Sequence, residues 1–180
     1  MNILLTGAAG FIGFHSARRL LANGHRVLGI DNLNTYYDVA LKHDRLAQLE
    51  GQPGFTFQRI DLADREAMAA LFDAHRFDAI LHLGAQAGVR YSLDAPFAYI
   101  DSNLTGFLSV LEGARRHGVR HLVYASSSSV YGANVKQPFC VEDRTDTPVS
   151  LYAATKRAGE LIAYSFSHIH RLPATGLRFF

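Results

Sequence analysis

The stretch Asn2-Ile-Leu-Leu-Thr-Gly-Ala-Ala-Gly-Phe-Ile-Gly13 joins a short apolar run to three regularly spaced glycines, and a segment of helical period follows it. Gly7, Gly10 and Gly13 stand where a tight turn, a close approach to a pyrophosphate and close helix–strand packing leave no room for a Cβ. The free N–H groups and positive dipole end of the following helix suit an anion. A plain turn would use the same glycines, but their place between a strand and a helix predicts a dinucleotide site.

Beyond this stretch, short apolar runs alternate with longer helical segments, as in βαβ units that build a parallel sheet. Right-handed crossovers then favour an α/β fold, a doubly wound parallel sheet of the Rossmann type with strand order 3-2-1-4-5-6, helices on both faces and its ligand crevice at the carboxyl ends of the strands. We predict strands at Asn2–Thr6, Arg26–Ile30, Phe55–Arg59, Ala79–Leu83, His121–Ala125 and Thr175–Phe179, and helices at Phe11–Asn23, Asp64–His75, Asp94–His117 and Ser150–His170.

The composition is that of an ordinary folded domain. The chain has 180 residues, of which 48% are hydrophobic and 19% charged, so we expect one domain over residues 1–180. Its net charge is +2 and its Lys and Arg are scattered, which points to neither a nucleic-acid nor a membrane partner. The single cysteine, Cys140, and the lack of a signal peptide or long apolar run favour a cytoplasmic protein. The histidine pairs have no convincing metal-ligand spacing.

Acidic residues close the second and third predicted strands. Asp31 can accept hydrogen bonds from both hydroxyls of an adenosine ribose, although a helix cap or turn would also use an aspartate. Its charge would repel a 2′-phosphate, and residues 32–37 contain no arginine to neutralise one, so the pattern favours NAD over NADP. Asp61 could bond the adenine amino group, but helix capping explains this residue nearly as well.

Tyr152 and Lys156 lie four residues apart on a predicted helix and therefore share one face. A tyrosine with a pKa of about 10 must lose its proton to act as a base near pH 7, which costs about 4 kcal/mol. A lysine ammonium and a cationic nicotinamide ring both favour the phenolate. Because this spacing occurs by chance in many helices, the interpretation depends on its combination with the glycines and with the serines described next.

Four serines stand at the end of the fifth predicted strand, within Tyr124-Ala-Ser-Ser-Ser-Ser-Val-Tyr-Gly132. Serines also end strands and cap turns. At the carboxyl end of a central strand, however, a hydroxyl can orient a substrate alcohol. The run therefore predicts a substrate contact at the crevice.

These motifs together resemble the extended short-chain dehydrogenase/reductases, and the likeness spans almost the whole chain. It is carried by the glycine-rich loop, by His82-Leu-Gly-Ala-Gln-Ala-Gly-Val-Arg-Tyr-Ser92, by the serine run and by Tyr152-x-x-x-Lys156. Within that superfamily, Asp31-Asn-Leu-Asn-x-Tyr-Tyr-Asp38, Ala85-Gln-Ala-Gly-Val-Arg90 and Ser150-Leu-Tyr-Ala-Ala-Thr-Lys156 are most similar to the UDP-glucuronate 4-epimerases.

The resemblance implies a catalytic role for three residues: Tyr152 as base, Lys156 as the group that positions the nicotinamide ribose and lowers the tyrosine pKa, and Ser127 as the holder of the sugar 4-hydroxyl. In that chemistry the C4 hydride passes to NAD, and the resulting 4-keto sugar rotates and takes the hydride back on its other face. Besides Gly7, Gly10, Gly13, Asp31, Asp61, Tyr152 and Lys156, the implied cofactor contacts are Phe11, Ile12, Asn32, Leu62, Leu83, Ala85, Gln86, Asn103, Ala125 and Ser126. Implied substrate contacts are Ser127, Ser128 and Arg90, the last of which is equally well explained as a solvated or dimer-contact arginine.

The resemblance also implies a homodimer, formed by the long helix that ends near Gly118 and by the last helix. The substrate-binding region is expected to follow Phe180, so residues 1–180 alone should bind NAD without epimerising a UDP-sugar. Two alternatives stay open. A 4,6-dehydratase or reductase would share the architecture, but dehydratases carry an Asp-Glu pair where this chain has Ser128 and Ser129. A noncatalytic NAD-binding protein would be expected to lose the tyrosine, the lysine or the serine.

Overall fold

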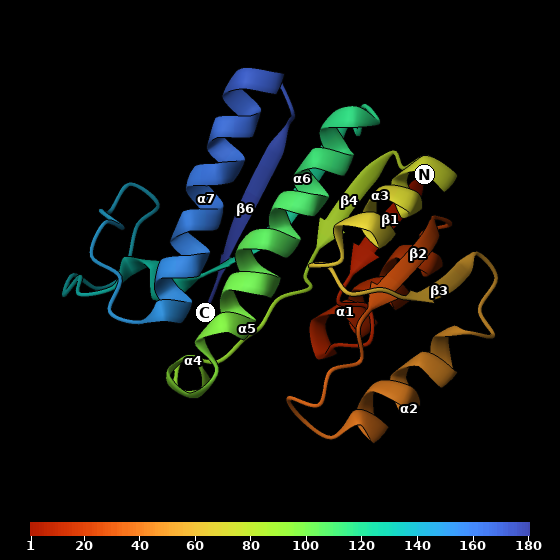
Figure 1. Ribbon diagram of the computed structural model, residues 1–180, viewed down its shortest axis with the longest axis horizontal. Helices are drawn as coiled ribbons and strands as arrows, with labels where there is room; N and C mark the ends of the chain where they lie inside the picture. The colour runs from red at the N-terminus through yellow and green to blue at the C-terminus, as the bar shows by residue number, and fades with distance from the viewer.

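A six-stranded parallel sheet forms the centre of the protein in a computed structural model that describes residues 1–180. The strand order is β3-β2-β1-β4-β5-β6, which confirms the predicted doubly wound fold (Figure 1). The strands are β1 (Asn2–Thr6), β2 (Arg26–Asp31), β3 (Phe55–Arg59), β4 (Ala79–His82), β5 (His121–Ser127) and β6 (Ala174–Phe179).

Helices cover both faces of this sheet (Figure 1). They are α1 (Phe11–Ala22), α2 (Val39–Leu49), α3 (Arg65–Ala74), α4 (Tyr91–Asp94), α5 (Pro96–Ile100), the π-helix η1 (Asp101–Thr105), α6 (Gly106–Arg116), the 3₁₀-helix η2 (Ser128–Tyr131) and α7 (Leu151–His170). None of them combines the length and the apolar character that crossing a membrane requires.

The alternation of side chains along the strands produces two separate cores. Leu4 packs with Phe72 of α3 and Leu111 of α6 on one face, whereas its neighbour Leu5 packs with Phe14 of α1 and Leu49 of α2 on the other. This is the period of two that a strand covered on both faces imposes. The sheet is thereby held between helices, and its carboxyl edge is left for the connecting loops.

Three details differ from the sequence-based prediction. Helix α2 was not predicted: six of its eleven residues are apolar, but only two of these, Leu46 and Leu49, are buried, together with Lys42. The helix predicted from Asp94 to His117 is formed by α5, η1 and α6 in succession, after the short α4. Strand β4 ends one residue earlier than predicted, and β5 continues two residues further because β6 pairs with it as far as Ser127.

Candidate nucleotide-binding and catalytic site

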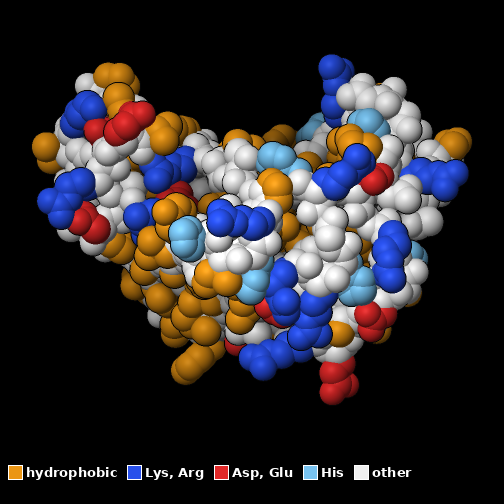
Figure 2. All heavy atoms as spheres, turned by 90° about the horizontal axis from the view of Figure 1, so that it is seen from above, with side chains coloured by type: hydrophobic (Ala, Val, Ile, Leu, Met, Phe, Trp, Pro, Cys, Tyr) orange, Lys and Arg blue, Asp and Glu red, His pale blue; other side chains and the backbone are white.

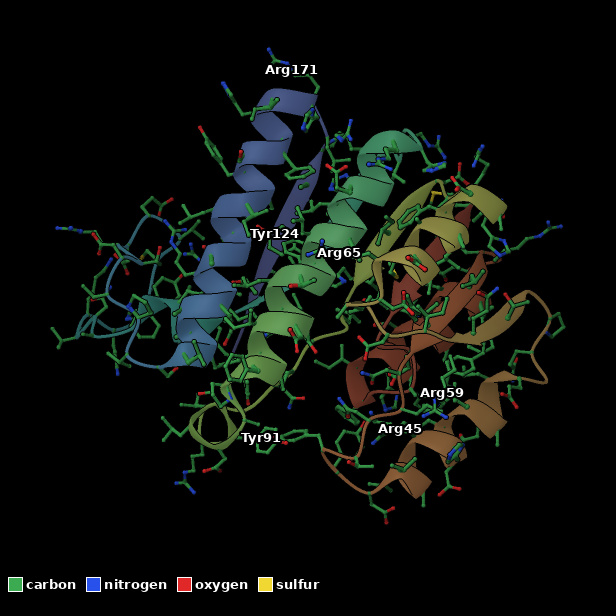
Figure 3. All side chains as sticks on the ribbon, viewed as in Figure 1. Arg45, Arg59, Arg65, Tyr91, Tyr124 and Arg171 are labelled. Atoms are coloured by element: carbon green, nitrogen blue, oxygen red, sulfur yellow. The ribbon has the colours of Figure 1, made fainter.

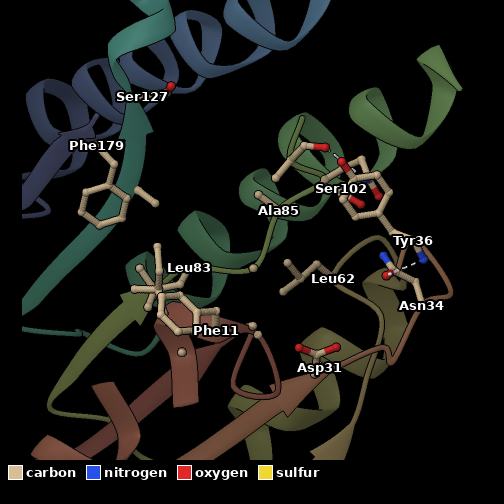
Figure 4. A pocket seen from close by; sticks show the side chains of 18 of the residues that line it. Phe11, Asp31, Asn34, Tyr36, Leu62, Leu83, Ala85, Ser102, Ser127 and Phe179 are labelled. Carbon is tan, nitrogen blue, oxygen red and sulfur yellow. Dashed lines mark hydrogen bonds between the residues drawn. The ribbon is translucent and has the colours of Figure 1, made fainter. Parts of the chain in front are cut away.

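A cavity of about 600 Å³ lies at the carboxyl ends of the strands, within the usual size of a ligand site. It extends from Phe11 and Asp31 at one end to Ser127 and Phe179 at the other (Figure 4). The predicted site residues that line it are Gly7, Gly10, Phe11, Ile12, Gly13, Asp31, Asn32, Asp61, Leu62, Leu83, Ala85, Gln86, Ala125, Ser126, Ser127, Ser128, Tyr152 and Lys156.

The glycine-rich loop closes tightly at the foot of α1. Gly7 has a φ of +71°, a conformation that residues with a Cβ rarely adopt. Gly10 caps α1 without a side-chain hydrogen bond, so the first N–H groups of this helix have no partner within it. These groups lie on the cavity wall, where an anionic ligand such as a pyrophosphate would satisfy them.

Asp31 is anchored against this loop by its own carboxylate. Its Oδ2 accepts a hydrogen bond from the Ala9 N–H at 3.2 Å, and its Oδ1 accepts one from the Leu33 N–H at 2.9 Å. Asp31 therefore has the turn role that the sequence left open beside a role in ribose binding. Lys42 of α2 also approaches Oδ1, at 3.5 Å, and lines the cavity. This lysine was not predicted as a site residue from the sequence, because α2 itself was not predicted.

Asp61 likewise combines a local role with a place in the cavity wall. Its Oδ1 accepts from the Ala63 N–H and its Oδ2 from Asn32 Nδ2, both at 2.9 Å. The cap of α3 is a different residue, Asp64, which accepts from the Ala67 N–H. A contact of Asp61 with an adenine amino group stays a prediction.

Ser127, Tyr152 and Lys156 meet at the opposite end of the cavity. Burial raises the pKa of Tyr152 above its ordinary value, and the nearby Ser127 hydroxyl lowers it by less. Lys156 Nζ donates to the Ala125 carbonyl at 3.0 Å and lies 6.0 Å from the centre of the Tyr152 ring. Burial lowers the pKa of Lys156 to about 8. The resemblance implied that Lys156 lowers the pKa of Tyr152. In this structure the net shift of the Tyr152 pKa is upward.

Two of the predicted site residues do not line the cavity. Asn103 is buried behind Gln86: its Oδ1 accepts from the Gln86 N–H at 2.8 Å, and its Nδ2 donates to the Gln86 carbonyl at 3.0 Å and to Thr155 Oγ1 at 3.1 Å. Asn103 thus ties the segment after β4 to α7 instead of lining the site. Arg90 is exposed at the start of α4, away from the cavity lining, and a substrate contact for it stays a prediction.

A cluster of tyrosines connects the Tyr152 end of the cavity to the loop after β2. Tyr36 from that loop packs on Tyr91 of α4 with ring centres 4.9 Å apart. Figure 3 shows Tyr91 beside α4, on the side of the loop that follows β2. The hydroxyl of Tyr99 donates to the Ala87 carbonyl at 2.8 Å, and its ring lies 6.1 Å from that of Tyr152. Segments far apart in the sequence thereby support one wall of the cavity.

Glu160 of α7 is a further residue that the sequence analysis missed. Its carboxylate accepts from Ser126 Oγ at 2.6 Å, from Arg178 Nε and Nη2 at 2.9 and 3.0 Å, and from Arg157 Nη1 at 2.8 Å. Burial raises the Glu160 pKa, but these hydrogen bonds lower it further, so the net shift is downward. The sequence did offer one indication: Glu160 lies four residues after Lys156 and therefore shares its helix face. The cluster joins β5, β6 and α7 just behind Ser127.

We expect Glu160→Gln to destabilise the protein by about 2 kcal/mol at pH 7, because it leaves two guanidinium groups without their carboxylate. The lowered pKa means that the contribution of Glu160 is complete above its unfolded value of 4.5 and is lost as the pH falls through the folded value. Urea unfolding at pH 7 and pH 3 should therefore give a difference from wild type that shrinks in acid. A difference that grows in acid would contradict this interpretation of the cluster.

Comparison with known proteins identifies the family. The sequence profile described as the NAD dependent epimerase/dehydratase family matches residues 3–180. The chain belongs to this family. The match extends from the first strand through the last, so the cavity and its lining residues Ser127, Tyr152 and Lys156 lie within the family's domain.

The relatives of this epimerase/dehydratase chain include an uncharacterised 37.6 kDa protein of Escherichia coli O111:H-, 61% identical over 100% of this chain and 54% of that protein. A probable UDP-glucuronate 4-epimerase of Rhizobium meliloti is 49% identical over 100% of this chain and 53% of its own length. The crystal structure of UDP-glucuronic acid 4-epimerase from Bacillus cereus, in complex with UDP-glucuronic acid and NAD, superimposes with a TM-score of 0.90 at 34% identity, covering 100% of this chain and 56% of that one. The chain thus spans about half the length of the relatives it matches.

Proposed function

We propose that the protein carrying these residues is an NAD-dependent 4-epimerase of a UDP-sugar, specifically UDP-glucuronate. The observation that carries the proposal is the meeting of Ser127, Tyr152 and Lys156 in the same cavity as the glycine-rich loop and Asp31. The relatives support the substrate, since one is named a probable UDP-glucuronate 4-epimerase and another was solved with UDP-glucuronic acid and NAD.

The cavity suits a dinucleotide on its own chemistry. The unpartnered N–H groups of α1 would take the pyrophosphate, Asp31 the adenosine ribose, and Lys156 the nicotinamide ribose. A Cβ at Gly13 would come within 2.0 Å of the Gly7 carbonyl oxygen, so the loop tolerates no side chain there. When bound, NAD supplies a hydride acceptor for C4 of the sugar and then a hydride donor.

The chain's own residues would manage the proton of the sugar 4-hydroxyl. Ser127 is close enough to Tyr152 to lower its pKa, so the group proposed to hold that hydroxyl lies next to the group proposed to take its proton. Tyr152 would accept the proton as C4 is oxidised and return it as C4 is reduced. The ammonium of Lys156, near the Tyr152 ring, favours the phenolate that this transfer requires. Ser128 and Ser129 also line the cavity, and neither is the acid that elimination chemistry would need.

The test is to assay the complete natural protein against a panel of UDP-sugars, separating the epimers and measuring the NAD that stays bound. We expect UDP-glucuronate to interconvert with its C4 epimer without net reduction of NAD. Accumulation of a 4-keto-6-deoxy product would favour the dehydratase alternative. NAD binding without turnover of any sugar would favour the noncatalytic one.

We further propose that two copies of the complete protein associate through α4 to α7, in the cytoplasm. Large apolar side chains are exposed there, among them Leu93, Phe97 and Tyr164 at 80%, 79% and 73%. Figure 2 shows hydrophobic side chains gathered in one patch of the surface. Apolar surface of this kind favours association. Sedimentation equilibrium is expected to give twice the monomer mass, and a strictly monomeric protein would contradict the proposal.

A further inference from the structure

A buried lysine lies beside Asp31 in the cavity wall. Lys42 is 4% exposed, and its Nζ donates to Asn34 Oδ1 at 3.0 Å and to Asp31 Oδ1 at 3.5 Å. The ammonium also lies 5.1 Å from the centre of the Tyr37 ring. Lysine is almost never fully buried unless it is paired. All four residues line the cavity, so this cation stands at the site and not in the core behind it.

The hydrogen bonds of this pair leave two complementary positions. A carboxylate offers about four acceptor positions, and Ala9, Leu33 and Lys42 occupy three on Asp31. An ammonium has three donors, and Asn34 and Asp31 take two on Lys42. One acceptor and one donor therefore remain. A ribose diol matches them, because one hydroxyl can donate to Asp31 while the other accepts from Lys42.

The pair also changes the electrostatic argument for the choice of cofactor. A lone carboxylate repels a 2′-phosphate, but Asp31 and Lys42 together carry no net charge. A second cation is close: Arg45 Nη1 donates to the Ala9 carbonyl at 3.2 Å and to the Tyr37 hydroxyl at 3.0 Å, and Figure 3 shows Arg45 on the same helix α2. If Asp31 alone loses its charge, Lys42 becomes an uncompensated buried ammonium beside the ribose position.

We propose that Lys42 is a specificity-determining residue of the cofactor site: it binds the adenosine ribose together with Asp31, and it becomes the ligand of a 2′-phosphate once Asp31 is neutralised. This inference rests on the proposed function, which takes NAD as the cofactor. It assigns the preference for NAD to the charge of Asp31, which also engages the Lys42 ammonium, and makes the chain one substitution away from accepting NADP.

The experiment measures the dissociation constants of NAD and NADP by titration calorimetry on the complete natural protein. Wild type should prefer NAD. Asp31→Asn, which keeps the shape of the side chain, should improve the preference for NADP over NAD by about 30-fold or more, since it exposes a charged donor to the phosphate. Adding Lys42→Met should remove most of that gain. Lys42→Met alone should weaken the binding of NAD about tenfold and should not improve the binding of NADP.

The matched control is Lys136→Met, because Lys136 is also paired with a carboxylate, at 2.7 Å, but lies outside the cavity and is exposed. It should change neither constant. Circular dichroism checks folding, and Lys42→Gln replaces Lys42→Met if the latter is unfolded. In the Asp31→Asn background, Lys42→Arg should keep the gain in NADP affinity.

The inference would be overturned if Asp31→Asn and the double variant Asp31→Asn, Lys42→Met had the same preference for NADP over NAD. A wild type that binds NAD but is indifferent to every change at Lys42 would overturn it too, and would leave the proposed function standing. A wild type that binds neither dinucleotide would instead remove the cofactor assignment, and this inference with it.

Discussion

Replacing Tyr152 by Phe in the complete natural protein is expected to lower turnover of the UDP-sugar by about a thousandfold, within the range for removal of a general base. The change removes the hydroxyl whose pKa Ser127 lowers but keeps the ring that packs beside Tyr99. The glycine-rich loop and Asp31 are untouched, so the dissociation constant of NAD should change by less than about twofold. Steady-state kinetics and calorimetry on the same preparation measure the two effects separately.

Tyr164→Phe is the control, because Tyr164 lies on the same helix but is 73% exposed and outside the cavity. It should keep wild-type turnover. If Tyr152→Phe retained more than about a tenth of the wild-type rate, the proton would be passing through another group. If instead NAD binding fell as far as turnover, the tyrosine would serve the cofactor and not the reaction.

Gly13→Ala should abolish measurable NAD binding. An added Cβ would lie 2.0 Å from the Gly7 carbonyl oxygen and 2.8 Å from its carbonyl carbon, and both are backbone atoms that no rotamer change can move aside. The loop must therefore shift, which costs about 2 kcal/mol of stability and displaces the N–H groups that face the ligand. We expect the affinity for NAD to fall at least about a hundredfold.

Gly51→Ala supplies the comparison, since a Cβ at Gly51 meets no atom within 4 Å and its φ is not positive. This variant should match wild type in thermal unfolding and in NAD titration. Unchanged NAD affinity in a folded Gly13→Ala protein would mean that the glycine-rich loop does not hold the cofactor.

The sequence by itself determined the fold class, the strand order and most of the cavity wall. These features depend on local patterns: apolar runs of strand length, glycines between a strand and a helix, and Tyr152 and Lys156 one turn apart on α7. In a doubly wound sheet, loops that follow the strands meet at one edge. Residues placed at strand ends were thus brought together by the topology alone, without knowledge of any contact between them.

The tertiary structure decided which charges are buried together. Lys42 reaches Asp31 from a helix that buries too few apolar side chains to be predicted, and Arg178 reaches Glu160 from a strand eighteen residues further along. Asn103 turns to the backbone of Gln86 and leaves the cavity wall. The direction of the Tyr152 pKa shift also depends on burial. Such pairings follow from distances between segments that are remote in the chain, and desolvation follows from packing on every side, so neither has a local signature in the sequence.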